Sequence, residues 1–187
     1  MREFDDLDAY LVASSGDEDL AFLPVPIVAE YLGISSPAVT ARLKSGSLEE
    51  VRIGKQRFVS RRSLVALREA DQDMIERTEA FLVDLARRGE TRVFYDPVMS
   101  NVGLRWQVPA HRDKIGWVLG QVSERSYAKD KVLLSVLVHK KTPGDTLPSG
   151  GFFDMAGQPD LDTEGKHDLV ARETRKVRKK FGRPKAA

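Results

Sequence analysis

The chain has 187 residues, of which 41% are hydrophobic, and 30 Lys and Arg side chains nearly balance 28 Asp and Glu. This length predicts one compact domain or two small ones. No cysteine occurs, which excludes disulfides, thiolate catalysis and cysteine–zinc sites. There is no apolar run near the roughly 18 residues of a membrane span, and the start MREFDDLD is unlike a signal peptide. We therefore expect a cytoplasmic protein.

The first segment, residues 1–22, predicts a short acidic helix followed by a loop. Phe4, Leu7 and Leu11 share one face of a helix over 2–13, and aspartates occupy the rest. Two interpretations stay open. The helix packs on the next domain and shows its acids to water, or it competes with a polyanion for a basic surface.

A second segment, residues 23–67, begins with a pattern typical of a short capped helix. Pro26 suits the first helical turn, because the N–H that proline lacks would be unpaired there. Gly33 supplies a left-handed residue that ends the helix. Between them, four side chains recur at helical spacing and predict one apolar face: Ile27, Val28, Tyr31 and Leu32.

The same segment continues with a second helix and a hairpin. Ser35 or Ser36 caps the second helix, with Pro37 in its first turn, and Gly46 ends it. Residues 51–60 then alternate around Gly54-Lys55, as a β-hairpin does. Within the second helix, Val39 and Leu43 face the first helix and leave Thr40, Arg42 and Lys44 outside.

Charge supports a nucleic-acid surface here. Between Arg42 and Arg68 the chain carries eight basic residues and two acidic ones, as an electrostatic footprint on a polyanion requires. The alternatives are a solvated surface that keeps the domain soluble, and a winged helix that binds protein.

The order A-E-Y-L-G-I-S-S-P-A-V-T, then G-S-L, then R-I-G-K-Q-R-F-V, resembles the winged DNA-binding domain of MerR-type regulators and phage excisionases. The resemblance covers about 45 residues, 23–67. It implies that the second helix enters the major groove and that the hairpin, or wing, follows the phosphates. Position by position, it places Ser35, Ser36, Ala38, Thr40, Ala41 and Arg42 towards the bases, Lys55, Gln56 and Arg57 at the wing tip, and Arg61 and Arg62 near the backbone.

A long helix is predicted over 61–88, and residues 68–90 are expected to link two domains. Its apolar stripe consists of Leu64, Leu67, Met74, Ile75, Phe81, Leu82 and Leu85. The resemblance implies that this helix pairs two subunits through residues 64–85, giving a homodimer. Burial of the stripe against the C-terminal half is the alternative.

Residues 91–165 predict a small α+β module. We expect strands over 92–95 and 104–108, a helix over 111–124, and a central strand over 131–139. The Pro- and Gly-dense loop TPGDTLPSGGFF follows. The run L-L-S-V-L-V-H-K-K with the later P-S-G-G-F-F is similar to segments of uncharacterised bacterial proteins, a resemblance that implies no activity.

A candidate enzyme for this module is a Mg²⁺-dependent nuclease, which needs two or more carboxylates and often a lysine. The spacing matches no nuclease motif, and there is neither a phosphate-binding loop nor a G-x-S-x-G serine. We read the pair His167-Asp168 as a structural helix start. We therefore expect no metal and no cofactor. The polar candidates are Asp96, His111, His139, Lys140, Asp145, Asp154, His167 and Asp168.

The last segment, residues 166–187, predicts a basic helix and tail. Gly182-Arg183-Pro184-Lys185 resembles the core of an AT-hook, although Phe181 stands where an arginine would precede the glycine. We expect sequence-neutral phosphate contact by Arg175, Lys176, Arg178, Lys179, Lys180, Arg183 and Lys185. A disordered solubilising end and contact with the acidic N-terminal helix are the alternatives.

The sequence as a whole predicts an α+β fold with an N-terminal winged helix-turn-helix, a linking helix, and a C-terminal α+β module with a basic helical tail. The expected function is sequence-specific binding of double-stranded DNA in transcriptional regulation, by a non-enzymatic, nucleoid-associated protein of bacterial or phage type. Three alternatives remain. They are an excisionase-like factor that bends DNA, a DNA-targeted Mg²⁺-dependent nuclease, and an adaptor whose C-terminal module binds a protein or small ligand.

Overall fold

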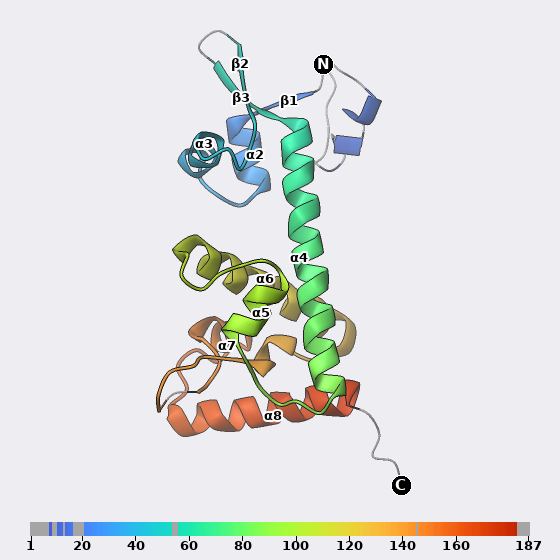
Figure 1. Ribbon diagram of the computed structural model, residues 1–187, viewed down its shortest axis with the longest axis vertical. Coiled ribbons are helices and arrows are strands. Elements are labelled where there is room, and N and C mark those ends of the chain that lie inside the picture. The colour runs from blue at the N-terminus through green and yellow to red at the C-terminus, as the bar shows by residue number, and fades with distance from the viewer. Residues whose placement is uncertain are drawn as a thin grey trace. The chain divides into compact units, whose positions relative to one another are not determined.

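The computed structural model describes residues 8, 11, 12, 14–16, 21–53, 56–144 and 146–182 of an α+β chain (Figure 1). The chain divides into two compact units, residues 1–71 (unit 1) and 72–187 (unit 2). Helix α4 (Arg61–Arg87) contributes its first turns to unit 1 and the remainder to unit 2. In the described ranges, every helix falls short of the length and apolar content that together allow a bilayer to be crossed.

Unit 1 is built from two short helices and a three-stranded antiparallel sheet. Its order is the 3-10 turn η1 (Ser14–Gly16), β1 (Phe22–Pro24), α2 (Val25–Tyr31), α3 (Ser36–Lys44), β2 (Glu50–Ile53), β3 (Gln56–Ser60) and the start of α4. The sheet order is β1-β3-β2, with Leu23 opposite Val59 and Val51 opposite Phe58. The hairpin predicted over 51–60 is confirmed, because β2 and β3 pair as neighbours.

Local signals set the ends of both helices in unit 1. Gly33 has φ of 63° and Gly46 has φ of 76°, the left-handed region in which a glycine ends a helix without steric cost. The Oγ of Ser35 accepts a hydrogen bond from the N–H of Ala38 at 3.4 Å, so Ser35 rather than Ser36 caps α3. The two predicted helices are therefore confirmed together with their ends.

The core of unit 1 lies between α2, α3 and the sheet. Val28, Val39 and Val59 are fully buried there, and Leu64 of α4 joins them. One prediction is wrong. Ile27, expected on the apolar face of α2, is 45% exposed, because a seven-residue helix buries a single narrow strip that runs through Val28 and Ala29.

The acidic N-terminal helix predicted over 2–13 lies mostly outside the described residues. Leu11 is buried in the core of unit 1, and its carbonyl accepts a hydrogen bond from Nη2 of Arg61 at 3.2 Å. Asp8 forms an ion pair with Arg68. These contacts support the interpretation in which the segment packs on the domain that follows it.

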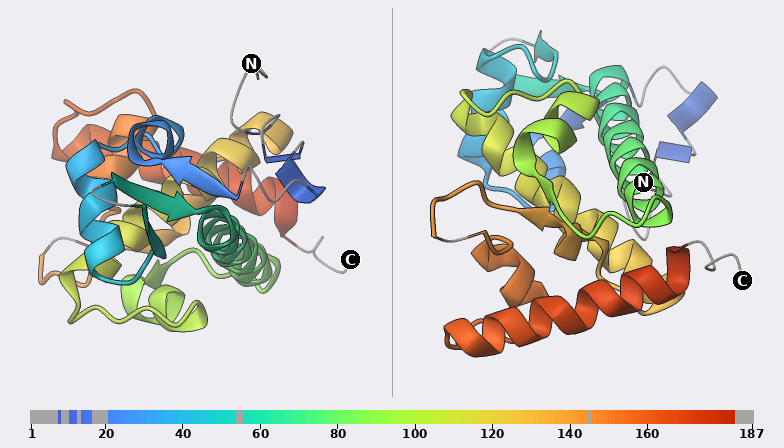
Figure 2. Two further views of the ribbon diagram at one scale, coloured as in Figure 1. Left: turned by 90° about the horizontal axis from the view of Figure 1, so that it is seen from above. Right: turned by 60° about the horizontal axis from the view of Figure 1, so that its bottom comes forward.

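Unit 2 is mainly helical. It contains α5 (Tyr95–Asn101), α6 (Pro109–Asp130), the 3-10 helix η3 (Leu134–Leu137), α7 (Gly150–Met155) and α8 (Thr163–Phe181), besides the later turns of α4 (Figure 2). Strands β4 (Val93–Phe94) and β5 (Val138–His139) form one short parallel pair. Helix η3 contacts both α6 and α8, so the buried segment 132–139 forms the centre of this unit.

The central strand predicted over 131–139 is wrong. Residues 132–139 are all buried, but only Val138 and His139 form a strand. Serine side chains of α6 take the place of a neighbouring strand. Ser126 Oγ donates to the carbonyl of Val132 at 2.8 Å, and Ser123 Oγ accepts from the N–H of Ser135 at 3.1 Å. A continuous apolar run indicates burial and leaves the conformation open.

The other elements of unit 2 differ from expectation in extent. No strand forms over 104–108, where the N–H of Val108 instead closes a turn on the carbonyl of Arg105 at 3.2 Å. The strand predicted over 92–95 is limited to β4, since α5 begins at Tyr95. Helix α6 is longer than predicted at both ends, and α8 confirms the predicted C-terminal helix.

The apolar stripe of α4 is buried within the chain. Leu64 belongs to the core of unit 1, and Ile75, Leu82 and Leu85 belong to that of unit 2. This is the alternative interpretation of the stripe. Homodimerisation through residues 64–85 stays a prediction, and it would have to use other side chains of that segment.

Candidate nucleic-acid interface

Helix α3 has a buried side and an open side. Val39 and Leu43 are 0% and 6% exposed and pack against α2 as predicted. All seven residues predicted for base or groove contact on α3 and at its cap lie on the remaining surface. Ser35, Ala41 and Lys44 are exposed, and Ser36, Ala38, Thr40 and Arg42 are half-buried.

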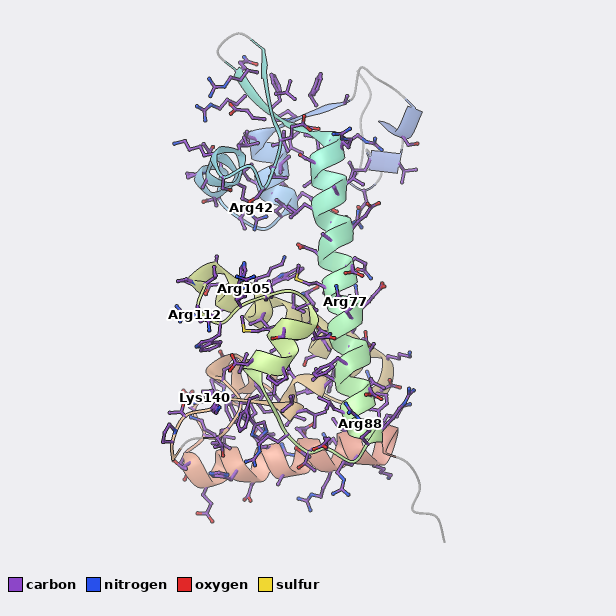
Figure 3. All side chains as sticks on the ribbon, in the orientation of Figure 1. Arg42, Arg77, Arg88, Arg105, Arg112 and Lys140 are labelled. Carbon is purple, nitrogen blue, oxygen red and sulfur yellow. The ribbon has the colours of Figure 1, made fainter. Side chains whose placement is uncertain are left out.

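The polar groups on this open side differ in how far they are already engaged. The Oγ1 of Thr40 donates to the carbonyl of Ser36 at 3.0 Å, and Ser35 is occupied by the cap. The side chains of Arg42, which Figure 3 labels, and of Lys44 have no hydrogen-bond or ion-pair partner among the described residues. These two cations are therefore free to meet an external anion.

The hairpin carries a three-residue charge cluster. Arg52 lies directly opposite Arg57 across β2 and β3, an arrangement of like charges that is unfavourable by itself. Glu50 relieves it, because its Oε1 is 2.7 Å from Nε of Arg52 and 3.3 Å from Nε of Arg57. The hydrogen bond from Arg52 lowers the pKa of Glu50 from its ordinary value. The predicted phosphate contact Arg57 is thus partly neutralised.

Arg52 is a candidate that the sequence reasoning missed. Its side chain is 62% exposed, more than the 37% of Arg57. Strand register could have found it. Pairing around Gly54-Lys55 places residues 52 and 57 on one face of the hairpin, so both arginines point the same way.

The remaining predicted residues of unit 1 fall into two groups. Gln56 and Arg62 are exposed, without a side-chain partner among the residues that the structure describes. Arg61 is half-buried and donates to the carbonyl of Leu11, while its Nε is buried without a partner in the described structure. Its role there is therefore to hold the N-terminal segment rather than to face solvent. Lys55 lies outside the described residues.

The predicted basic residues of α8 belong to unit 2. Val177 is buried, and the cations lie around it on the outside of the helix. Lys176 pairs with the buried Glu173 at 2.8 Å, and Lys180 pairs with Asp130 at 2.6 Å. Arg175, Arg178 and Lys179 form no ion pair within the described part of the chain, whereas Arg183 and Lys185 lie outside it.

Among the described residues, the nuclease candidates do not gather into a metal site. No group of three His, Asp or Glu side chains suited to a metal occurs in the described ranges, and Asp145 lies outside them. His139 is 7% exposed, and its ring nitrogens face the carbonyls of Val136, at 3.0 Å, and Thr146. Burial lowers the pKa of His139, which favours the neutral ring, and a neutral ring can donate to only one of these two carbonyls.

The other candidates lie apart from one another. The Nδ1 of His111 accepts from the N–H of Arg105 at 3.0 Å, Asp96 is in the first turn of α5, and Asp154 is in α7. Lys140 and His167 line a common pocket, and Asp168 is exposed on α8.

No protein-family model, curated protein or solved structure matches this chain.

Proposed function

We propose that unit 1 is a winged helix-turn-helix domain that binds double-stranded DNA and that the protein regulates transcription. In this proposal α3 enters the major groove, and the β2–β3 hairpin follows the phosphates. The observation that carries it is the open side of α3, where Arg42 and Lys44 are unpaired among the described residues while Val39 and Leu43 fix the helix on α2.

The open side of α3 and the β2–β3 hairpin carry arginines in different settings, and the first setting suits contact with bases whereas the second suits contact with phosphates. A half-buried arginine held near a helix surface can make a bidentate contact to a guanine edge, which discriminates between bases. The exposed Arg52 and the half-buried Arg57 share one face of the hairpin and suit phosphates, which carry no sequence information. Arg62, exposed in the first turn of α4, is a further phosphate contact in this proposal.

Two single substitutions test this division of roles. Arg42→Ala should weaken binding to a preferred duplex by about tenfold or more, and it should change the preference at one or two base positions. Arg57→Ala should weaken all duplexes alike and reduce the slope of log K against log salt by about one unit. Fluorescence anisotropy with labelled duplexes over a series of salt concentrations measures both.

Arg87→Ala is the matched control, because it removes one exposed arginine from the end of α4 that belongs to unit 2. It should leave affinity and preference unchanged. If Arg42→Ala and Arg57→Ala reduced binding to every duplex by the same factor with the same change in slope, the assignment of roles would be wrong.

The basic face of α8 adds sequence-neutral affinity in this proposal, through Arg175, Arg178 and Lys179. Association with the nucleoid would follow from the same contacts. The proposed function includes no enzymatic step.

A further inference from the structure

Unit 2 contains a pocket that DNA binding does not use. Its volume is about 370 Å³, within the usual range of small-ligand sites. Residues of α6 and of the segment P-S-G-G-F-F form much of its wall. The lining residues used below are Tyr95, Arg112, Asp113, Gly116, Ser149 and Phe152.

The interior of the pocket is apolar with one polar corner. Leu119, Val138 and Phe152 are buried side chains that line it. The hydroxyl of Tyr95 donates to Oγ of Ser149 at 2.9 Å, which leaves the hydroxyl hydrogen of Ser149 for an acceptor inside the pocket. Such a lining suits a ligand with an apolar body and a few polar atoms at one end.

Glycine at position 116 makes the opening wide. Gly116 is exposed on the α6 face that lines the pocket, and a Cβ placed there would meet no atom within 4 Å. Glycine inside a helix is unfavourable compared with alanine. Its presence in the middle of a 22-residue helix therefore has a reason other than helix formation, and open space at the pocket wall is one.

Opposite charges stand next to each other on the same wall. Arg112 and Asp113 both line the pocket, and neither forms an ion pair with a described residue. The guanidinium of Arg112 lies 5.6 Å from the ring of Trp106, which in turn lies 5.7 Å from the ring of Tyr95. The indole of Trp106 is 43% exposed. A cation and an anion thus line the pocket, and an aromatic ring lies beside the cation, Arg112, which is labelled in Figure 3.

We propose that this pocket binds a small zwitterion with an aromatic group, the chemical class of the aromatic α-amino acids. Arg112 receives the carboxylate through paired N–H donors, and Asp113 receives the ammonium. The aromatic group enters the apolar interior, where Tyr95 and Phe152 offer ring contacts. A ligand that carried only a negative charge would be repelled by Asp113, and a ligand that carried only a positive charge would be repelled by Arg112. This inference is independent of the function proposed for unit 1.

Isothermal titration calorimetry on the full chain tests the proposal. The probes are L-phenylalanine, L-tyrosine and L-tryptophan, together with 3-phenylpropionate, which lacks the ammonium, and phenethylamine, which lacks the carboxylate. We expect at least one of the three amino acids to bind at millimolar concentration or below. For L-phenylalanine, removal of either charged group should weaken binding at least tenfold. Absence of binding by all three amino acids, or equal binding by 3-phenylpropionate, overturns the proposal.

Substitutions on α6 locate the site. Arg112→Gln and Asp113→Asn should each reduce affinity for the bound amino acid at least tenfold, and Gly116→Leu should abolish binding by filling the opening. The control is Ala128→Leu, which adds the same bulk at an exposed position of α6 that does not line the pocket. Circular dichroism confirms that all four variants fold. Undiminished binding by a folded Gly116→Leu variant would place the ligand elsewhere and overturn the assignment.

Discussion

The two units satisfy their buried backbone groups in different ways. In unit 1 the strands β1, β3 and β2 pair in one ladder, and the helix ends are closed by Ser35, Gly33 and Gly46. In unit 2 the buried segment 132–135 has no strand beside it and depends on the hydroxyls of Ser123 and Ser126. The comparison teaches that paired strands and helix caps satisfy the buried backbone of the first unit, whereas side-chain hydroxyls of a neighbouring helix do so in the second.

The units also use their cations differently. On α3, Arg42 and Lys44 have no ion-pair partner among the described residues, so they remain available to a ligand. On α8, Lys176 and Lys180 are held by Glu173 and Asp130, and Lys180 thereby joins α8 to the end of α6. A count of basic residues therefore overstates the charge that unit 2 can offer to DNA.

The largest expected effect concerns the buried serines. Ser126→Ala removes the donor to the carbonyl of Val132 and the acceptor for the N–H of Leu134. We expect a loss of about 1–3 kcal/mol in the free energy of unfolding of unit 2, since buried polar groups lose their partners. Urea unfolding followed by tryptophan fluorescence measures it, because Trp106 and Trp117, the chain's two tryptophans, are both in unit 2.

Ser100→Ala is the control for that measurement, because Ser100 is exposed on α5. Its expected effect is within about 0.5 kcal/mol. Equal unfolding midpoints for the Ser126 variant and the wild type would show that these hydroxyls do not hold the segment.

The next effect concerns the unpaired cations of α8. Changing Arg175, Arg178 and Lys179 together to Gln should lower affinity for every duplex by about tenfold at low salt and reduce the salt slope by roughly two to three units. Point substitutions are preferred to deletion of the segment, because Val177 in the same stretch is buried in the core. Anisotropy over a salt series measures the change.

An equal change of charge elsewhere in unit 2 is the control for α8. Arg87, Lys129 and Lys141 are exposed cations outside α8, and their joint change to Gln should have a much smaller effect. If both triple variants lost the same affinity, net charge alone would explain the result, and α8 would have no particular role.

A smaller effect is expected from the acid of the hairpin. Glu50→Gln releases Arg52 and Arg57 from a shared carboxylate. We expect affinity for all duplexes to rise a few-fold, which corresponds to less than about 1 kcal/mol. Glu49→Gln is the matched control, because Glu49 is the exposed neighbour whose carboxylate has no partner in the described ranges. A rise in affinity of the same size in both variants would show that the change in net charge explains it, and that the ion pairs of Glu50 have no particular role.

The smallest effect is a pH dependence in unit 2. Burial holds the pKa of folded His139 below the ordinary value of 6.5, so below pH 6.5 the unfolded chain binds more protons than the folded one. Stability should therefore fall as pH drops from 6.5 towards the lowered pKa, and it should be level above 6.5. Unfolding of the wild type and His139→Gln by urea at several pH values tests this. The contribution of His139 is refuted if both show the same slope.

The elements that could be predicted from the sequence are those whose signals lie within a few residues of one another. Gly33, Ser35, Gly46 and the alternation around Gly54-Lys55 each act within a few residues, so the helices and hairpin of unit 1 could be predicted. The run 131–139 could be predicted as buried. Its conformation could not, because Ser123 and Ser126 lie about two helical turns before it in α6 and look like ordinary small polar residues in the sequence.

The candidate site was predictable to a similar degree. Helical periodicity separated Val39 and Leu43 from the open side of α3. Pairing of charges in space was not predictable from composition: Glu50 holds Arg57, and Leu11 and Asp8 bind Arg61 and Arg68 from far along the chain.

Selection from a randomised duplex library, carried out in parallel with the wild type and the Arg42→Ala variant, tests the central claim most directly. We expect the wild type to enrich a short sequence motif and the variant to enrich a motif changed at one or two positions. Enrichment of no motif by the wild type, or of an identical motif by both proteins, would contradict the proposal that α3 reads DNA.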